Sequence, residues 1–137
     1  MFRIVLIAFL LWLGLFFVIS LVGLYNDPVS FAIRLDNGNG QTNFNWGQKF
    51  ILNYSLSNYW PEEIKNITVT TKILDKFGSE KVDYYVGLNS FNTISGNYTL
   101  DRLELYSGNY TIKTDLDYID RFNHPAHKEL TLGFLVK

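Results

Sequence analysis

From residue 29 to residue 136, apolar side chains recur at every second position along one segment after another. Successive side chains of a β-strand point to opposite faces, so this alternation predicts strands that are buried on one face and wet on the other. We expect seven such strands, and nothing after residue 25 has the apolar period of a helix. The strands centre on the apolar sets around Phe31, Leu52, Val69, Tyr84, Tyr98, Ile112 and Leu132.

Short stretches rich in glycine, asparagine and aspartate separate these segments, as at residues 36–40, 75–78 and 107–109. Such composition is typical of turns. A single sheet of seven strands this apolar would leave an apolar face in water, so we expect two sheets packed face to face. The sequence thus predicts an all-β fold, a seven-stranded antiparallel β-sandwich over residues 29–137. The chain has no cysteine, so no disulfide holds this domain together.

The first 25 residues differ from the rest because they hold an uncharged apolar run from Ile4 to Tyr25. At about 1.5 Å per residue, a helix of this run covers the ~30 Å hydrocarbon core of a bilayer. We therefore predict one transmembrane helix over residues 1–25 and a short linker over residues 26–28. Two alternatives stay open. One is a cleaved signal peptide, for which Val18-x-Ser20 is the best cleavage pattern, and the other is a helix buried in a soluble core or a pilin-like assembly.

Charges beside the apolar run predict its orientation. The α-amino group and Arg3 precede the run, whereas the first charge after it is Asp27. Cationic residues are retained on the cytoplasmic side. We therefore expect a single-pass protein of the cell membrane with a cytoplasmic N-terminus and an extracytoplasmic C-terminal domain. Its expected partners are the lipid bilayer and the subunits of an integral membrane protein complex, as part of a hetero-oligomer.

The balance of charge argues against nucleic acid as a partner. The chain carries 12 basic and 13 acidic residues, and without Arg3 the part after residue 25 has 11 basic residues against 13 acidic ones. A net charge near −2 gives no basic footprint for phosphate groups. We therefore expect no binding to nucleic acid.

The stretch from Leu103 to Ile112, LELYSGNYTI, resembles a strand corner of immunoglobulin-like and fibronectin type III-like sandwiches. In those domains a tyrosine at the start of a strand bonds back across the corner, and Tyr110 is the residue that matches. Tyr54 to Asn58, followed by Trp60-Pro61, resembles an earlier strand passage of the same superfamily. The cysteine pair and core tryptophan of antibody domains are absent, so the resemblance is to the cysteine-free branch. It implies an immunoglobulin-like fold and almost nothing about activity.

Both histidines of the chain, His124 and His127, lie in one acidic stretch, residues 115–127. Carboxylates and imidazoles are ligands of divalent metals. The place of this loop also resembles that of the copper ligands in cupredoxin-like sandwiches. However, the chain has no cysteine and Met1 is its only methionine, which excludes a blue-copper or dinuclear copper site. A site made of His124 and His127 needs a further ligand from elsewhere, so we predict no metal and no cofactor, with the two histidines as the only candidates.

Four Asn-x-Ser/Thr patterns are present, more than the composition gives by chance. Each is an acceptor pattern for N-glycosylation in a eukaryotic or archaeal host. The candidate glycoprotein sites are Asn53, Asn66, Asn97 and Asn109. All four fall in the outward phase of the expected strands, although the polar face of any strand places Asn and Thr two positions apart.

We find no catalytic motif: no phosphate-binding glycine loop, no nucleophile with its base, and carboxylate pairs only at turns. The sequence therefore favours a non-catalytic, membrane-anchored accessory or structural subunit. Its sandwich is expected to pack on a membrane protein complex, for example a respiratory or quinone-linked one, or on an envelope partner. The alternatives are an archaeal surface filament, adhesion or archaellum-type component, and a copper-handling cupredoxin-like subunit. The linker of three residues supports the accessory-subunit hypothesis, because it keeps the domain close to the expected membrane.

Overall fold

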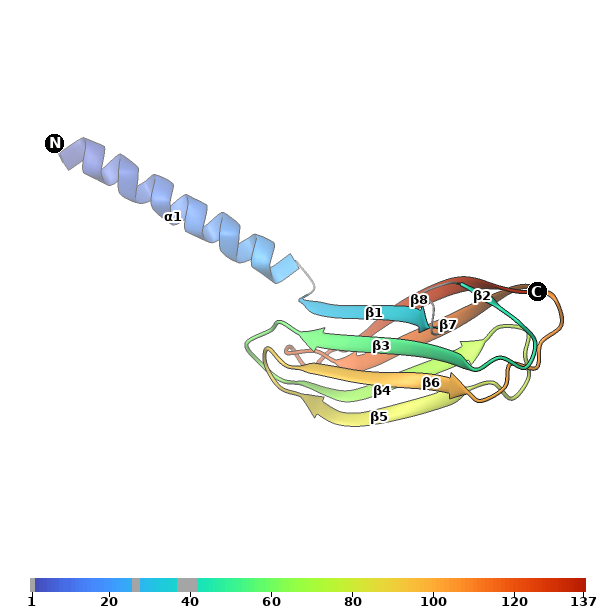
Figure 1. The fold of residues 1–137 in the computed structure, drawn as a ribbon. Helices are drawn as coiled ribbons and strands as arrows, with labels where there is room; N and C mark the ends of the chain where they lie inside the picture. Colours follow the sequence, from blue (N-terminus) through green and yellow to red (C-terminus); the bar gives the residue numbers. More distant parts are fainter. Residues whose placement is uncertain (1, 26–27, 37–41) are drawn as a thin grey trace.

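The computed structural model describes residues 2–25, 28–36 and 42–137, and within the helix it describes the side chains of residues 4–18. In these ranges one helix is followed by eight strands (Figure 1). The elements are α1 (Phe2–Tyr25), β1 (Val29–Asp36), β2 (Asn43–Phe44), β3 (Phe50–Asn58), β4 (Ile64–Ile73), β5 (Lys81–Leu88), β6 (Thr93–Leu100), β7 (Gly108–Ile119) and β8 (Pro125–Val136).

The strands form two sheets that pack face to face (Figure 1). One sheet has three strands in the order β1-β3-β6, and the other has five in the order β2-β8-β7-β4-β5. All neighbours pair antiparallel except β2, which runs parallel to β8. The predicted pair of β-sheets is therefore present, with the long hairpin of β7 and β8 inside the larger sheet.

The predicted count of seven strands is wrong, because β2 is an eighth. Its two residues are too few for an alternating pattern to reveal them. The strand forms because Phe44 is buried in the core, and because the neighbouring backbone bonds to β8. Leu135 N donates to Thr42 O at 3.1 Å, and Lys137 N donates to Phe44 O at 2.9 Å.

Two apolar clusters fill the space between the sheets, and every member lies between residues 29 and 136. One cluster is built on aromatic rings. Phe50 is fully buried, and its ring centroid lies 4.9 Å from that of Phe44 and 5.0 Å from that of Phe134. The other cluster holds Tyr54, Trp60 and mainly aliphatic side chains. The sandwich therefore has its own core, to which the described side chains of α1, residues 4–18, do not contribute.

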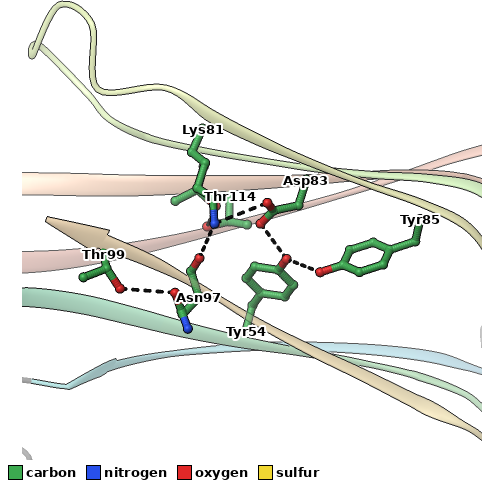
Figure 2. Close-up of polar contacts among 8 residues, drawn as sticks. Tyr54, Lys81, Asp83, Tyr85, Asn97, Thr99 and Thr114 are labelled. Atoms are coloured by element: carbon green, nitrogen blue, oxygen red, sulfur yellow. Dashed lines mark hydrogen bonds and ion pairs between the residues drawn. The ribbon is translucent and has the colours of Figure 1, made fainter.

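Polar bonds close both open edges of the sandwich. Figure 2 shows the edge between β5 and β6, where Tyr54 reaches from β3 to β5 and donates its hydroxyl proton to Asp83 Oδ2 at 2.7 Å. Beside it, Lys81 Nζ donates to Asn97 O at 2.7 Å. At the opposite edge, the Lys128 ammonium donates to the carbonyl oxygen of Val29, which joins β8 to β1.

Helix α1 carries the apolar run and stands clear of the sandwich in Figure 1. Over residues 4–18 every side chain is exposed. No helix in the described part of the chain is long and apolar enough to cross a membrane.

This finding contradicts the predicted transmembrane helix over residues 1–25, and with it the description of the chain as a single-pass membrane protein. The predicted fold class, a sandwich preceded by a transmembrane helix, is corrected to a mainly β chain with two sheets and one N-terminal helix. Of the predicted linker 26–28, residues 26 and 27 lie outside the described residues.

Candidate functional site

The β7–β8 hairpin brings four ionisable side chains to one place on the outer face of the five-stranded sheet. Asp115 pairs directly with Glu129, and Asp117 pairs with His127. Thr114 and Leu116, which alternate with Asp115 and Asp117 along β7, are buried, so the two aspartates point outward. Directly opposed residues of an antiparallel pair have Cβ atoms about 4.5–5.5 Å apart, which is close enough for their side chains to meet. We call Asp115, Asp117, His127 and Glu129 the outer-face cluster.

The His127 ring lies between two carboxylates. Its Nδ1 is 2.7 Å from Asp117 Oδ1 and its Nε2 is 3.5 Å from Asp115 Oδ1. Lys113 adds a positive charge next to the cluster, with Nζ at 2.9 Å from Glu129 Oε2 and 3.3 Å from Asp115 Oδ1. Among the described residues, Asp115, His127 and Glu129 each offer a ligand atom, and these atoms all lie within 4.8 Å of one another.

Asp115 occupies the centre of this arrangement. Its side chain is only 16% exposed, and its Oδ1 is buried without a hydrogen bond among the described residues. Lys113 Nζ and His127 Nε2 are its ion-pair contacts, at 3.3 and 3.5 Å. Both distances exceed the usual 2.7–2.9 Å of a charge-assisted hydrogen bond. Asp115 Oδ1 can therefore still accept a hydrogen bond or bind a cation within the cluster.

The carboxylates favour positive charge on their neighbours. The hydrogen bond to Asp117 is the largest cause that raises the pKa of His127. The hydrogen bond to Glu129 is the largest cause that raises the pKa of Lys113. The His127 side chain is 52% exposed and that of Lys113 is 25% exposed, so solvent screens these effects in part.

Of the two candidate histidines, the structure places only His127 in the outer-face cluster. His124 lies in the turn before β8, where its backbone N donates to Asp120 Oδ1 at 2.9 Å and its ring lies 6.4 Å from that of Phe122. Glu129 is a member that the sequence analysis missed. The available signal was the hairpin itself, because a turn centred on Phe122 pairs Asp115 with Glu129.

The Tyr54 hydroxyl is a second polar site, at the edge between the sheets. It contacts Asp83 Oδ2 at 2.7 Å and the Tyr85 hydroxyl at 2.6 Å (Figure 2). Burial, followed by the bonds to Tyr85 and Asp83, raises the pKa of Tyr54 far above its ordinary value. Because its single proton goes to Asp83, the Tyr85 hydroxyl is the donor to Tyr54. These contacts bind β3 to β5 and serve stability.

The Tyr110 ring stacks on that of Phe134, with centroids 5.7 Å apart. Its hydroxyl donates to Tyr106 O, four residues upstream, at 2.8 Å. This is the bond that a tyrosine corner requires. Tyr110 thus fixes the entry of the chain into β7.

All four candidate glycosylation residues are exposed. Asn53 and Asn97 are cross-strand partners on β3 and β6, where Thr99 Oγ1 donates to Asn97 Oδ1 at 3.2 Å. Asn66 lies at the irregularity of β4 with a φ of 51°, and Asn109 is the second residue of β7. Their exposure would let an oligosaccharide project into solvent, and their modification stays a prediction.

The sequence matches no protein-family model and no curated protein. Among solved structures, the chain is similar to the CARDB domain of the PF1109 protein from Pyrococcus furiosus, which was solved in complex with di-metal ions. Identity is 12% and the TM-score 0.53, and the match covers 81% of this chain and 90% of that one. The sporulation control protein Spo0M of Bacillus subtilis gives a TM-score of 0.43 at 9% identity, over 82% of this chain and 50% of that one.

At such low identity these likenesses concern the fold alone. The class that the fold defines is a β-sandwich domain similar to CARDB, preceded here by a helix. The likeness fits the β-sandwich part of the predicted immunoglobulin-like fold and says nothing of an anchor.

Proposed function

We propose that this chain is a non-catalytic accessory subunit, which a larger protein complex holds by α1 and by the adjoining end of the sandwich. The exposure of an apolar helix is the observation that carries this proposal. Trp12 and Phe17, for example, are 62% and 66% exposed. A helix that is apolar on all sides is normally buried, and large exposed apolar patches mark interaction sites.

The end of the sandwich nearest α1 adds aromatic rings to this surface. Tyr59 N donates to Pro28 O at 2.9 Å, so the Tyr59 loop lies where the chain enters β1. Phe91 is on the adjoining loop, because its N donates to Asn58 O at 2.7 Å, and its side chain is 71% exposed. Aromatic residues are enriched at protein interfaces. The helix and the adjoining end of the sandwich thus both expose apolar side chains.

The partner we propose is a subunit of an integral membrane protein complex, for example a respiratory or quinone-linked one. Such subunits present apolar helices against which α1 can pack. Contact of the chain with lipid stays a prediction.

The experiment is to purify the full-length chain from its host in mild detergent and to measure its mass and composition. We expect a complex of fixed stoichiometry with an integral membrane protein. A matched pair of variants then tests the helix. Leu11→Glu places one negative charge on α1, whereas Ala32→Glu places the same charge on the exposed outer face of β1. We expect the first variant to lose the complex and Ala32→Glu to retain it.

A shortened chain of residues 26–137 gives a second test, since both core clusters lie within it. We expect this chain to fold and to lose its partner. A monodisperse monomer of the full-length chain would refute the proposal, and so would full-strength binding by residues 26–137. An assembly made only of this chain would instead favour the filament alternative, with α1 helices packed on one another.

A further inference from the structure

We propose that Asp115, His127 and Glu129 bind one divalent transition-metal ion on the outer face of the five-stranded sheet. Asp117 positions the histidine ring and is not a ligand. This inference does not depend on the proposed accessory function, because the site lies in the sandwich, away from the residues of α1. It rests on the spacing of the ligand atoms, the orientation of His127, the unsatisfied oxygen of Asp115 and the local charge.

The spacing suits a small ion. Two ligand atoms at about 2.1 Å from a tetrahedral ion lie roughly 3.4 Å apart, and His127 Nε2 lies 3.5 Å from Asp115 Oδ1. Glu129 supplies the third atom within the 4.8 Å limit of the group. Its side chain is 49% exposed, so it has room to swing toward the ion. An ion bound there would keep a position open to water.

His127 is oriented as metal-binding histidines are. Such a histidine usually donates its second ring N–H to a carboxylate, which fixes the tautomer and aims the free nitrogen at the metal. Here Asp117 Oδ1 lies 2.7 Å from Nδ1 and accepts that proton. In the neutral ring the lone pair of Nε2 then faces Asp115.

No proton joins His127 Nε2 to Asp115 Oδ1 when the ring is neutral and its proton is on Nδ1. Both atoms are then acceptors, and they face each other at 3.5 Å. The Asp115 oxygen is buried and accepts no hydrogen bond among the described residues. A metal ion between the two atoms would bind both lone pairs at once.

The charge of the site matches a dication. Three carboxylates and the Lys113 ammonium give a net charge of −2 when His127 is neutral. Lys113 contacts two of the proposed ligands, Asp115 and Glu129, and therefore competes with the ion. Its long side chain can turn out to solvent when the ion binds. Lys113 thus lowers the affinity of the site for the metal ion. Its removal should therefore tighten metal binding, which a purely structural role of Lys113 would not predict.

The donor set of one imidazole and two carboxylates selects the kind of ion. Imidazole favours first-row transition ions such as Zn²⁺, whereas Mg²⁺ and Ca²⁺ favour sites made of oxygen alone. We therefore expect Zn²⁺ to bind in the presence of excess Mg²⁺.

Calorimetric titration of the untagged full-length chain in mild detergent with Zn²⁺, in excess Mg²⁺, tests the site. We expect one equivalent of Zn²⁺ per chain. His127→Ala should abolish this binding, and Asp117→Asn should weaken it about 10- to 100-fold, as loss of such an orienting carboxylate does. Lys113→Gln should bind Zn²⁺ more tightly than the parent chain. His124→Ala is the matched control, and we expect it to bind as the parent chain does.

Far-UV circular dichroism of each variant verifies that the sandwich is folded, and X-ray absorption of the Zn²⁺-bound chain reports its ligands. We expect one imidazole nitrogen and otherwise oxygen ligands. Less than a tenth of an equivalent of bound Zn²⁺ would overturn the proposal. The proposal would also be overturned if His124→Ala and His127→Ala lost Zn²⁺ binding equally, or if folded Lys113→Gln bound Zn²⁺ more weakly than the parent chain.

Discussion

Gly96 allows Tyr54 to join the two sheets, and its replacement by alanine tests how this edge is closed. The two residues face each other on β6 and β3. A Cβ atom at position 96 would lie 2.2 Å from the Tyr54 Oη and 2.3 Å from its Cζ. Real Cβ atoms essentially never approach other atoms this closely. In Gly96→Ala the tyrosine ring must therefore move away from β5.

The expected cost follows from the contacts that the ring makes. Forcing a methyl group into a packed site costs about 1–3 kcal/mol. The displaced hydroxyl loses its bonds to Asp83 and Tyr85, each of which contributes about 1–1.5 kcal/mol. Replacement of glycine by alanine returns about 0.4–1 kcal/mol by restricting the unfolded chain. We expect a net loss of about 2–6 kcal/mol in the free energy of unfolding.

Urea denaturation followed by circular dichroism measures this loss, and Gly133→Ala is the matched control. A Cβ at Gly133 meets only Tyr110 O, at 3.9 Å, which is ordinary contact. We expect this control to change stability by less than about 1 kcal/mol. In a Tyr54→Leu background the Gly96→Ala cost should largely vanish, because the atoms that the new Cβ meets are gone. Equal effects of the Gly96 and Gly133 variants would refute the reasoning.

Three further predictions concern single side chains. Tyr110→Phe should lower the free energy of unfolding by about 0.5–1.5 kcal/mol in urea denaturation, because it removes only the bond to Tyr106 O. Phe50→Ala should cost about 3–5 kcal/mol in the same assay, since Phe50 is fully buried. In NMR titration of the metal-free protein, His127 should show a pKa above its ordinary 6.5, and Asp117→Asn should lower it. Because the folded-state pKa is the higher one, the stability from charged His127 is complete below about pH 6.5 and is lost as the pH rises through the folded-state pKa.

The alternating pattern predicted most of the sandwich, because burial of one face imposes a period of two on every long strand. It places Leu52, Tyr54 and Leu56 in the core, and all three are buried. The pattern could not reveal β2, since a strand of two residues has no period. Phe44 reads as a loop residue in the sequence, and only the fold shows that its ring joins the aromatic cluster.

The outer-face cluster was predictable in part. The sequence places Asp115 and Asp117 on the outward face of one strand, and it marks His127 as a candidate. It does not fix the register of β7 against β8, and a shift by one residue would turn every side chain to the other face. Without this register, nothing connects Asp115 with Glu129 or His127 with Asp117.

The apolar run of α1 shows a similar limit. Its composition predicts that α1 is covered by an apolar environment, but a bilayer and an apolar protein surface make the same demand on a sequence. The transmembrane interpretation is contradicted, because no helix among the described residues is long and apolar enough to cross a membrane. The sequence therefore predicts that α1 is covered by an apolar surface, but it does not identify that surface.

The exposed helix is not explained by the stability of the isolated chain, and the outer-face cluster is explained only in part, because Lys113 and a charged His127 offset two of its three negative charges. The described apolar side chains of α1 are exposed, so they contribute no free energy of burial in the isolated chain. Like charges directly opposite on adjacent strands, as at Asp115 and Glu129, are destabilising. Each unfavourable feature would be relieved by a different species, an apolar partner in one case and a cation in the other. They involve different parts of the chain, since the described side chains of α1, residues 4–18, belong to neither core cluster and the outer-face cluster lies on β7 and β8. Charge on α1 should therefore abolish assembly without changing metal affinity, and loss of His127 should do the reverse.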